Sequence, residues 1–321
     1  MGEGKVAVVG AGFIGRGWII AFARAGLAVS VWSRSRATSE SALDYVRQVL
    51  PELAVQGLLN GRDPESVLAS ISIVDSIESA VEDATHIQEN LTEDVELKRA
   101  ILSRLDTLAA PDAVIASSTS ALVPTLIMSH LSGRHRCIVA HPLNPPHLIP
   151  ATEVVPHPWN TQEVIDRTCA TLEAAGQKTV LLRKEIDGFV VNRLQAALLN
   201  EAFRLVANGY ASIGDVDTAV KDGLALRWSF MGPFETIDLN ATHGVRDYVE
   251  RNDGLFRNLL SQMRDPVDWK EPLDTIERDR RAALPSDQLR ARQIWRDKRL
   301  AALSAHKSDA DRSIDEARVS Q

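Results

Sequence analysis

The sequence predicts an α/β fold, in which a doubly wound sheet is followed by an all-α C-terminal domain. Strand and helix patterns alternate from the N-terminus to about residue 184, which is typical of a sheet with helices on both faces. Beyond that point apolar residues recur at helical spacing and no further strand is indicated. We therefore expect a sheet domain at residues 1–186, a helical domain at 187–306 and a polar, mobile tail at 307–321.

The N-terminal segment has the pattern strand, turn, helix and strand. Residues 5–9 (KVAVV) are a β-branched run that predicts a strand, and residues 10–15 form a glycine-rich turn. The apolar residues of 16–25 have helical spacing, and Gly26 ends that helix. Residues 27–32 are expected to be the second strand. Together these elements are the first βαβ unit of a doubly wound sheet.

The remaining elements follow from the same periodicities. A helical arm is expected at residues 37–59, with a break at Leu50-Pro51 because proline lacks the N–H that a helix interior needs. A long helix is expected at 187–207 with Asp187 as its cap, and further helices extend to about His306. The other expected strands are residues 71–74, 85–89, 114–117, 137–140 and 152–155, and the other expected helices are 77–83 and 95–108.

The composition argues against several kinds of partner. The chain has 321 residues and a formal net charge of −7, so its charge favours neither nucleic acid nor an anionic membrane surface. No apolar run is long enough to cross a membrane, and the N-terminus has no secretory pattern. The two cysteines lie in no paired motif, which fits a reducing compartment. We expect a soluble, cytoplasmic protein.

The glycine-rich turn, GAGFIG at residues 10–15, matches the pattern G-x-G-x-x-G between a strand and a helix. Gly10 permits the tight turn, Gly12 lets the backbone approach a pyrophosphate, and Gly15 lets the helix pack against the strand. Phosphates would then meet the free N–H groups at the start of the helix. In this context the turn predicts a Rossmann-type dinucleotide site rather than a glycine turn without a ligand.

The end of the second strand bears on the choice between NAD and NADP. This position usually carries an acid that binds the ribose 2′-hydroxyl of NAD, but here residues 32–36 are WSRSR and contain no acid. The hydroxyl of Ser33 and the guanidinium groups of Arg34 and Arg36 would suit a 2′-phosphate. The two arginines could equally be solvated surface charges, so NAD and NADP both stay open.

Three polar side chains lie at or near the ends of predicted strands, where doubly wound sheets bind ligands. Ser120 ends a run of hydroxyl residues that could bind a substrate oxygen or cap a helix. His141 could take the proton of an alcohol while hydride leaves the adjacent carbon, or it could be structural. Glu153 lies in the apolar run 149–155 and needs a partner, either His141, which it would orient, or a distant basic residue.

Two amides are further candidates for the site. Asn144, in a proline-rich loop, could fix that loop or contact the substrate. Asn192, on an apolar helix face, could donate to a carbonyl oxygen in the transition state. The histidines of this region lack the spacing of metal ligands, and Ser120 does not sit in a nucleophile elbow, so neither metal catalysis nor Ser–His hydrolysis is expected.

Seven segments in order resemble the 3-hydroxyacyl-CoA dehydrogenase superfamily and, within it, the lambda-crystallin branch of L-gulonate 3-dehydrogenases. They run from near the N-terminus to the last helix, and their order and spacing make the resemblance specific. The segments are VGAGFIGRGW (9–18), HIQENLTEDVELK (86–98), SSTSAL (117–122), CIVAHPLNPPHLIPATEVVPHP (137–158), GFVVNRLQ (188–195), MGPFETIDLNA (231–241) and ARQIWRD (291–297).

The resemblance implies an activity and the residues that perform it. His141 resembles the family's base and Glu153 its partner, while Ser120 and Asn192 resemble the groups that hold the reacting oxygen. The implied reaction transfers hydride from the 3-hydroxyl of a small, L-gulonate-like hydroxy acid to NAD. One departure is Ser33, which stands where the family has an acid.

The resemblance also implies cofactor contacts and a second copy of the chain. Arg227 would lie near the subunit interface and neutralise a substrate carboxylate, and the family forms homodimers through its helical C-terminal domain. The implied contacts to the cofactor are Gly12, Phe13, Ile14, Glu93 and Lys98.

The substrate class stays open at this point. Acyl-CoA enzymes need basic residues for the CoA phosphates, whereas residues 39–59 carry Arg47 and several acids, which favours a small acid. An L-3-hydroxyacyl-CoA dehydrogenase and a carnitine-type 3-hydroxy acid dehydrogenase are the alternatives. A structural or nucleotide-sensing, crystallin-like protein would not need to keep the full set of candidate catalytic residues, so the sequence favours an enzyme.

Overall fold

The structure, a computed structural model, describes residues 4–319 of the chain, with side chains to residue 314. It divides into two compact units. Unit 1 comprises the chain up to Val191 and from Trp295 onward, and unit 2 comprises Asn192–Ile294. Unit 1 contains a sheet with flanking helices, and the described residues of unit 2 form helices and turns. The predicted fold class, an α/β doubly wound sheet followed by a helical domain, is confirmed.

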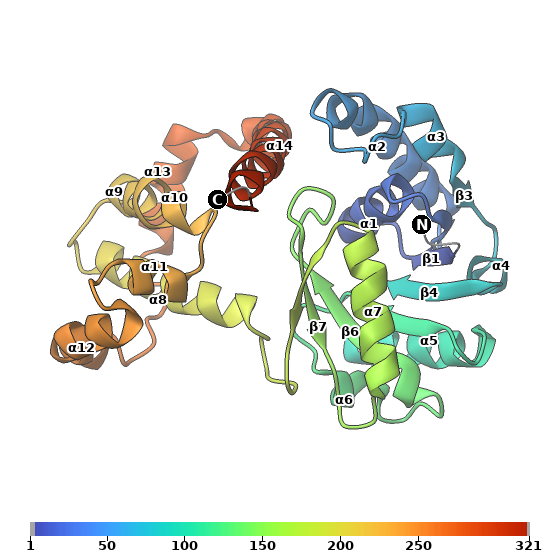
Figure 1. Cartoon of the computed structure of the whole chain (residues 1–321), viewed down its shortest axis with the longest axis horizontal. Helices are drawn as coiled ribbons and strands as arrows, with labels where there is room; N and C mark the ends of the chain where they lie inside the picture. Colours follow the sequence, from blue (N-terminus) through green and yellow to red (C-terminus); the bar gives the residue numbers. More distant parts are fainter. Residues whose placement is uncertain (1–3, 320–321) are drawn as a thin grey trace. The chain divides into compact units, whose positions relative to one another are not determined.

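Unit 1 is built on one eight-stranded sheet (Figure 1). The strands are β1 (Lys5–Val9), β2 (Ala28–Trp32), β3 (Ile71–Ile73), β4 (Ala84–Glu89), β5 (Val114–Ser117), β6 (Cys137–Pro142), β7 (Ala151–Val155) and β8 (Lys178–Leu181). Their order is β3-β2-β1-β4-β5-β6-β7-β8, and every neighbouring pair is parallel except β6 and β7. The strand order reverses between β1 and β4, so their carboxyl ends flank the place where doubly wound sheets bind ligands.

Helices cover both faces of this sheet. One face carries α1 (Phe13–Arg24), α2 (Arg36–Val55), α3 (Pro64–Ala69), α7 (Gln162–Ala174) and part of α14 (Leu289–Val319). The other carries α4 (Ile77–Val81), α5 (Val95–Leu108) and α6 (Pro124–Met128), and the short helix η1 (Arg134–Arg136) precedes β6. Strand β1 serves both cores, because Val6 and Val8 point to one face and Ala7 and Val9 to the other.

Two glycines fix how closely α1 approaches its neighbours. A Cβ on Gly15 would lie 1.9 Å from the carbonyl oxygen of Gly10, and one on Gly17 would lie 2.5 Å from Cδ of Pro146. Gly10 has a φ of +95°, a conformation that side chains rarely adopt. The turn after β1 and the loop after β6 are therefore both packed against the N-terminal half of α1.

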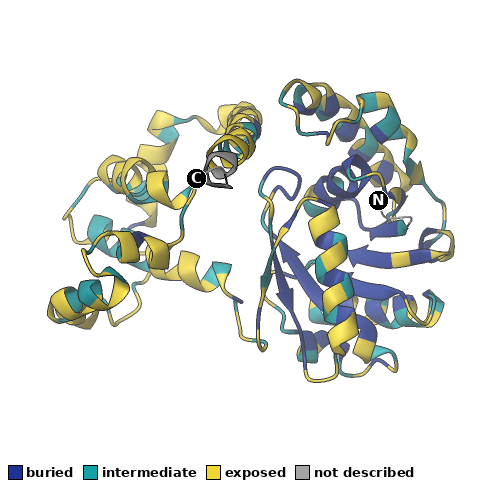
Figure 2. Ribbon diagram, viewed as in Figure 1, coloured by how far each residue is buried: buried dark blue, intermediate teal, exposed yellow. Residues whose placement is uncertain are grey.

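Unit 2 is helical and has few buried residues. Within Asn192–Ile294 only Thr236 and Pro272 are buried, and Figure 2 shows the contrast with the sheet of unit 1. Its elements are α8 (Val191–Ala207), α9 (Ile213–Thr218), the π-helical turn η2 (Ala219–Leu224), α10 (Ala225–Trp228), α11 (Pro233–Leu239), α12 (Gly244–Gln262), α13 (Leu273–Ala283) and η3 (Ser286–Gln288).

The compact units divide the chain differently from the expected domains. The first border falls after Val191 instead of residue 186, and the chain from Trp295 onward belongs to unit 1. Ala301 is 2% exposed within the core of unit 1, and the hydroxyl of Ser304 donates to the carbonyl of Leu148 at 2.9 Å. Burial of one face of α14 against the sheet domain explains the difference.

The segment expected as a tail, residues 307–321, is helical as far as it is described. Helix α14 extends to Val319, and residues 320–321 lie outside the described part of the chain. The polar composition predicted a mobile tail, whereas this segment continues a helix that packs against unit 1 near residues 300–304.

Helix α8 begins later than the sequence predicts. The expected start was Asp187, but the helix begins at Val191 because Gly188 and Phe189 have φ values of +72° and +51°. Left-handed backbone interrupts a helix, and for a bulky residue it is unfavourable. Phe189 is 0% exposed in the core of unit 1, and this burial offsets the strain.

Helix α2 has no break at the expected position. It runs from Arg36 to Val55 with Pro51 inside. Leu50 and Leu53, on either side of the proline, are 0% and 2% exposed. Their burial against the sheet outweighs the hydrogen bond that Pro51 cannot make.

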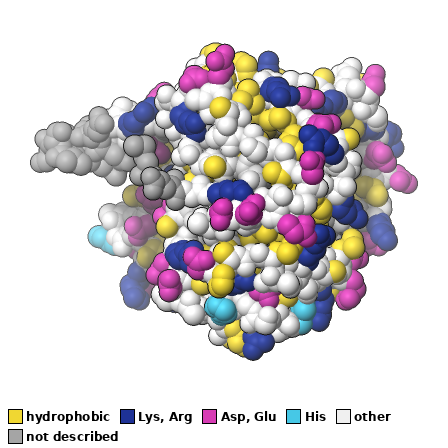
Figure 3. Space-filling view, turned by 90° about the vertical axis from the view of Figure 1, so that its right-hand side faces the viewer, with side chains coloured by type: hydrophobic (Ala, Val, Ile, Leu, Met, Phe, Trp, Pro, Cys, Tyr) yellow, Lys and Arg dark blue, Asp and Glu magenta, His cyan; other side chains and the backbone are white. Residues whose placement is uncertain are grey.

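The surface carries charges of both signs. Figure 3 shows one face of the molecule, on which Lys and Arg side chains are interspersed with Asp and Glu. Among the helices that the structure describes, none is long and apolar enough to cross a membrane.

Candidate active site

His141 and Glu153 lie opposite each other on neighbouring strands. Strands β6 and β7 are antiparallel, and their register pairs these two residues across a sequence separation of 12. Nδ1 of His141 lies 2.8 Å from Oε2 of Glu153. The Glu153 side chain is fully buried and the His141 side chain is 11% exposed, so the imidazole keeps an opening to solvent that its partner lacks.

The second carboxylate oxygen of Glu153 holds the start of α8. Oε1 accepts hydrogen bonds from the N–H groups of Val190 at 2.7 Å and Val191 at 2.9 Å. Burial alone would raise the pKa of Glu153, but the hydrogen bonds from His141 and from these two N–H groups bring it below its ordinary value. The carboxylate therefore stays charged at neutral pH.

A charged carboxylate at Nδ1 selects one form of the imidazole. Because a charged carboxylate can only accept, we assign a proton to Nδ1, which donates a hydrogen bond to Glu153 and in the neutral ring leaves Nε2 as a proton acceptor. The ring of Phe189 lies 5.6 Å from that of His141 between centroids and limits rotation of the imidazole. Such an arrangement is suited to a general base, because the carboxylate would stabilise the protonated imidazole.

The turn after β1 is suited to an anion. Gly12 caps α1 without a side-chain hydrogen bond, and the first turn of the helix has no acid, so its N–H groups can receive a phosphate. A Cβ built on Gly12 would meet no atom within 4 Å, which leaves the space that a pyrophosphate needs. Phe13 is 62% exposed and Ile14 is half-buried beside this turn. The residues present therefore fit the phosphates of a dinucleotide.

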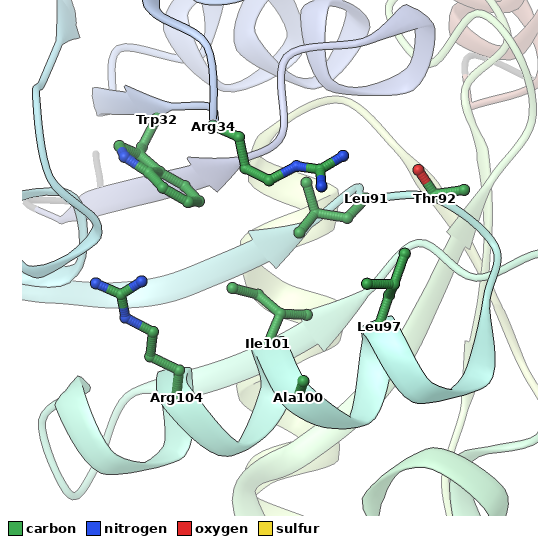
Figure 4. Close-up of a pocket in the computed structure, with 8 residues that line it drawn as sticks. All are labelled: Trp32, Arg34, Leu91, Thr92, Leu97, Ala100, Ile101 and Arg104. Carbon is green, nitrogen blue, oxygen red and sulfur yellow. The ribbon is translucent and has the colours of Figure 1, made fainter.

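A cavity of about 410 Å³ lies between the end of β2 and α5 (Figure 4). Its walls are mostly apolar, with two guanidinium groups among them, which suits a flat aromatic ring such as adenine. Ser33 links this cavity to the glycine turn, because its hydroxyl accepts a hydrogen bond from the N–H of Ala11 at 2.9 Å. The lining residues are Trp32, Arg34, Leu91, Thr92, Leu97, Ala100, Ile101 and Arg104.

Glu93 holds the segment that carries Ser120. Its Oε1 accepts hydrogen bonds from the Thr119 hydroxyl at 2.5 Å, from the N–H groups of Ser120 at 2.9 Å and Ala121 at 3.1 Å, and from the Ser120 hydroxyl at 3.3 Å. Burial would raise the pKa of Glu93, but these donors and the charge of Lys98 lower it. Ser120 is exposed, so its hydroxyl lies at the surface of the site.

Lys98 and Glu89 form a buried ion pair beneath that segment. The Lys98 ammonium lies 3.1 and 3.0 Å from the two carboxylate oxygens of Glu89, and the side chains are 1% and 0% exposed. The ammonium also lies 3.6 Å from Oε2 of Glu93. The ammonium of Lys98 thus faces two carboxylates, and its expected contact with the cofactor stays a prediction. Glu89 was not predicted as a site residue; its signal was an acid at the end of a predicted strand.

A part-buried polar network around Ser118 was not predicted from the sequence. Nε2 of Gln88 donates to the Ser118 hydroxyl at 2.8 Å and to the carbonyl of Ala140 at 3.3 Å. The Ser118 hydroxyl donates to Oδ1 of Asn90 at 2.7 Å and accepts from the indole of Trp18 at 3.1 Å. The network joins α1, β4 and the strand that carries the histidine. The one feature of the sequence that could have indicated this network is the polar side chain of Gln88 within a predicted strand.

Three other predicted site residues lie in the loop after β6 or in unit 2. Asn144 is exposed in the loop after β6. Asn192 follows Val191 directly and begins unit 2. Arg227 is exposed in α10 of the same unit. The roles of these three residues stay predictions.

Comparison with known proteins identifies the family. The model of the 3-hydroxyacyl-CoA dehydrogenase NAD binding domain matches residues 5–186, and that of the C-terminal domain matches residues 188–270. Lambda-crystallin of Oryctolagus cuniculus is 39% identical over 307 residues, which are 94% of this chain and 96% of that protein. L-carnitine dehydrogenase of Oceanobacillus iheyensis is 38% identical over 248 residues, which are 77% and 80% of the two chains.

Solved structures agree with this result. The chain resembles the NAD+-dependent 5-formyl-3-hydroxy-2-methylpyridine 4-carboxylic acid 5-dehydrogenase with a TM-score of 0.79 and 25% identity, over 95% of this chain and 98% of that one. It resembles 3-hydroxybutyryl-CoA dehydrogenase of Escherichia coli with a TM-score of 0.65 and 27% identity, over 74% of this chain and 50% of that chain. The chain therefore belongs to the 3-hydroxyacyl-CoA dehydrogenase family of NAD-dependent oxidoreductases.

Proposed function

We propose that this chain oxidises the 3-hydroxyl of a small, L-gulonate-like hydroxy acid, with NAD as the hydride acceptor. The observation that carries the proposal is the buried carboxylate of Glu153 at Nδ1 of His141, which leaves Nε2 free to act as a base. Oxidation of an alcohol needs such a base beside the reacting carbon. Similarity to lambda-crystallin along 94% of the chain supports this branch of the family.

In this mechanism Nε2 of His141 takes the proton of the 3-hydroxyl, and Glu153 stabilises the imidazolium that forms. Ser120 and Asn192 hold the reacting oxygen by hydrogen bonds, so that its proton faces the base. NAD, when bound, supplies the acceptor for the hydride of carbon 3. The product is a 3-oxo acid.

The chain's charges favour a small acid over an acyl-CoA. Within residues 39–59 the single basic side chain is Arg47, and it already lies 2.8 Å from Oδ1 of Asp44. This arm thus has no spare cation for the phosphates of CoA. Arg227, exposed in α10, is the residue that we assign to the carboxylate of the substrate.

We further propose that the chain works as a homodimer through unit 2. A unit of this length needs an extensive core, yet only Thr236 and Pro272 of its described residues are buried. Helix α12 presents an apolar stripe at helical spacing that a second copy would cover. Its exposed members are Val245, Val249, Phe256, Leu259 and Leu260.

The state of the cysteines supports our proposal that the protein works in the cytoplasm. Cys137 and Cys169 are both free thiols. Burial raises the pKa of Cys137 to about 12, so this thiol is unreactive at neutral pH. Free thiols persist in a reducing compartment.

The first test compares substrates. The purified chain with NAD is assayed on L-gulonate, L-carnitine and 3-hydroxybutyryl-CoA, following the absorbance of NADH. We expect kcat/KM to be highest for L-gulonate, and His141→Asn to lower kcat by about a thousandfold or more while the melting temperature stays close to wild type. A preference of more than tenfold for either other substrate would reject the L-gulonate assignment. Unchanged turnover by His141→Asn would show that His141 is not the general base.

The second test replaces the partner of the base. In Glu153→Gln the amide oxygen accepts the hydrogen bonds from the N–H groups of Val190 and Val191, so the amide NH₂ faces His141. The NH₂ then donates to Nδ1, which favours the form of the imidazole with its proton on Nε2. We expect kcat to fall by about a hundredfold to ten thousandfold with little change in KM. A loss confined to KM would contradict this role.

The same variant has a distinct signature in stability. The lowered pKa of Glu153 stabilises the folded protein above the ordinary value of 4.5, and this contribution disappears as pH falls through the folded pKa. The difference in free energy of unfolding between wild type and Glu153→Gln should therefore shrink below about pH 4.5. A difference that stays constant down to about pH 3 would contradict a charged Glu153.

The third test concerns the dimer. Sedimentation of the full chain should give twice the mass of one chain. Val249→Arg, which puts a charge into the apolar stripe of α12, should shift the protein to monomer or unfold unit 2. Glu250→Arg, at the neighbouring exposed position, is the matched control and should leave the dimer intact. Wild-type chain that sediments as a monomer, or Val249→Arg that stays dimeric, would contradict this interface.

A further inference from the structure

The nucleotide site of the proposed function lacks the acid that normally distinguishes NAD from NADP. At the end of β2, Ser33 occupies the position from which a carboxylate would bind the ribose 2′-hydroxyl. Its hydroxyl accepts a hydrogen bond from the N–H of Ala11 at 2.9 Å, so it is fixed beside the glycine turn. The hydroxyl can still donate its own proton outward. No negative charge at this position repels a 2′-phosphate.

The two arginines that follow Ser33 have different surroundings. Arg36 is already matched by acids, because it lies 2.9 Å from Glu40 and also pairs with Asp75. Arg34 is exposed and makes no ion pair with any residue that the structure describes. Of the two cations, Arg34 is thus the one available to a new anion.

The position of Arg34 suits the ribose of the adenosine. Its side chain lies along the wall of the cavity between Trp32 and Leu91 (Figure 4). Ser33, its neighbour in the chain, contacts the turn that would hold the pyrophosphate. The first turn of α2, which begins at Arg36, has no acid and no side-chain cap, so its N–H groups add positive potential at the same place.

We propose that this chain binds NADP as well as NAD, with the 2′-phosphate held between the hydroxyl of Ser33 and the guanidinium of Arg34. A guanidinium binds a phosphate through charge-assisted, often paired hydrogen bonds. Arg36, Glu40 and Asp75 together carry a net charge of −1, and Arg34 brings the net charge of the four side chains to zero before a phosphate binds. The inference rests on the nucleotide site of the proposed function and concerns the selectivity of that site between NAD and NADP.

Binding, measured without turnover, tests this inference. The full-length chain is titrated by calorimetry at low ionic strength with NADH and, separately, with NADPH. We expect the two dissociation constants to agree within about tenfold. Arg34→Ala should weaken NADPH binding by about tenfold and NADH binding by less than about threefold. Ser33→Asp should weaken NADPH binding by more than about a hundredfold, because a carboxylate then faces the phosphate.

Arg36→Ala is the matched control, since this arginine lies two residues from Arg34 but already pairs with acids. It should change the ratio of the two dissociation constants by less than about threefold. If wild type binds NADPH more than a hundredfold more weakly than NADH, or if Arg36→Ala removes NADPH binding and Arg34→Ala does not, the assignment is wrong. If neither nucleotide binds, the proposed nucleotide site itself is wrong. If NADH alone binds, only the proposed binding of NADP is wrong.

Discussion

The carboxylate of Glu153 is the group on which the proposed catalytic site depends. It is buried, which disfavours its charge, and it is kept ionised by three donors: the imidazole of His141 and two N–H groups at the start of α8. One side chain thus joins β6, β7 and the entry to the helical unit. It also fixes which nitrogen of His141 is basic, so the chemistry and the local fold share the same three hydrogen bonds.

A second set of polar contacts supports the part of the site that we propose for the substrate and the cofactor. The Glu89–Lys98 pair lies below Glu93, which in turn holds the loop of Ser120. Buried charges are tolerated when each is paired and hydrogen-bonded, and such networks hold loops in a single geometry. The glycine turn contributes rigidity in another way, because the position of Gly15 leaves no room for a side chain.

Much of this arrangement could be predicted from the sequence, because it depends on local patterns. The glycine turn, most strands of the sheet and the need of Glu153 for a partner are all visible in short segments. What could not be predicted depends on contacts between distant residues. The late start of α8 follows from the left-handed backbone at Phe189, whose ring is buried in the sheet domain. The pairing of Lys98 with Glu89 and the anchoring of α14 likewise need the folded chain.

The most direct test of the account is the protonation of the His141 ring. ¹⁵N-NMR of histidine-labelled protein, with the signals assigned by comparison with a His141→Gln variant, distinguishes a protonated from an unprotonated ring nitrogen. In the neutral ring we expect the proton on Nδ1 and a free Nε2. A neutral ring with its proton on Nε2 would contradict this expectation, because Nε2 would then have no lone pair to offer the substrate.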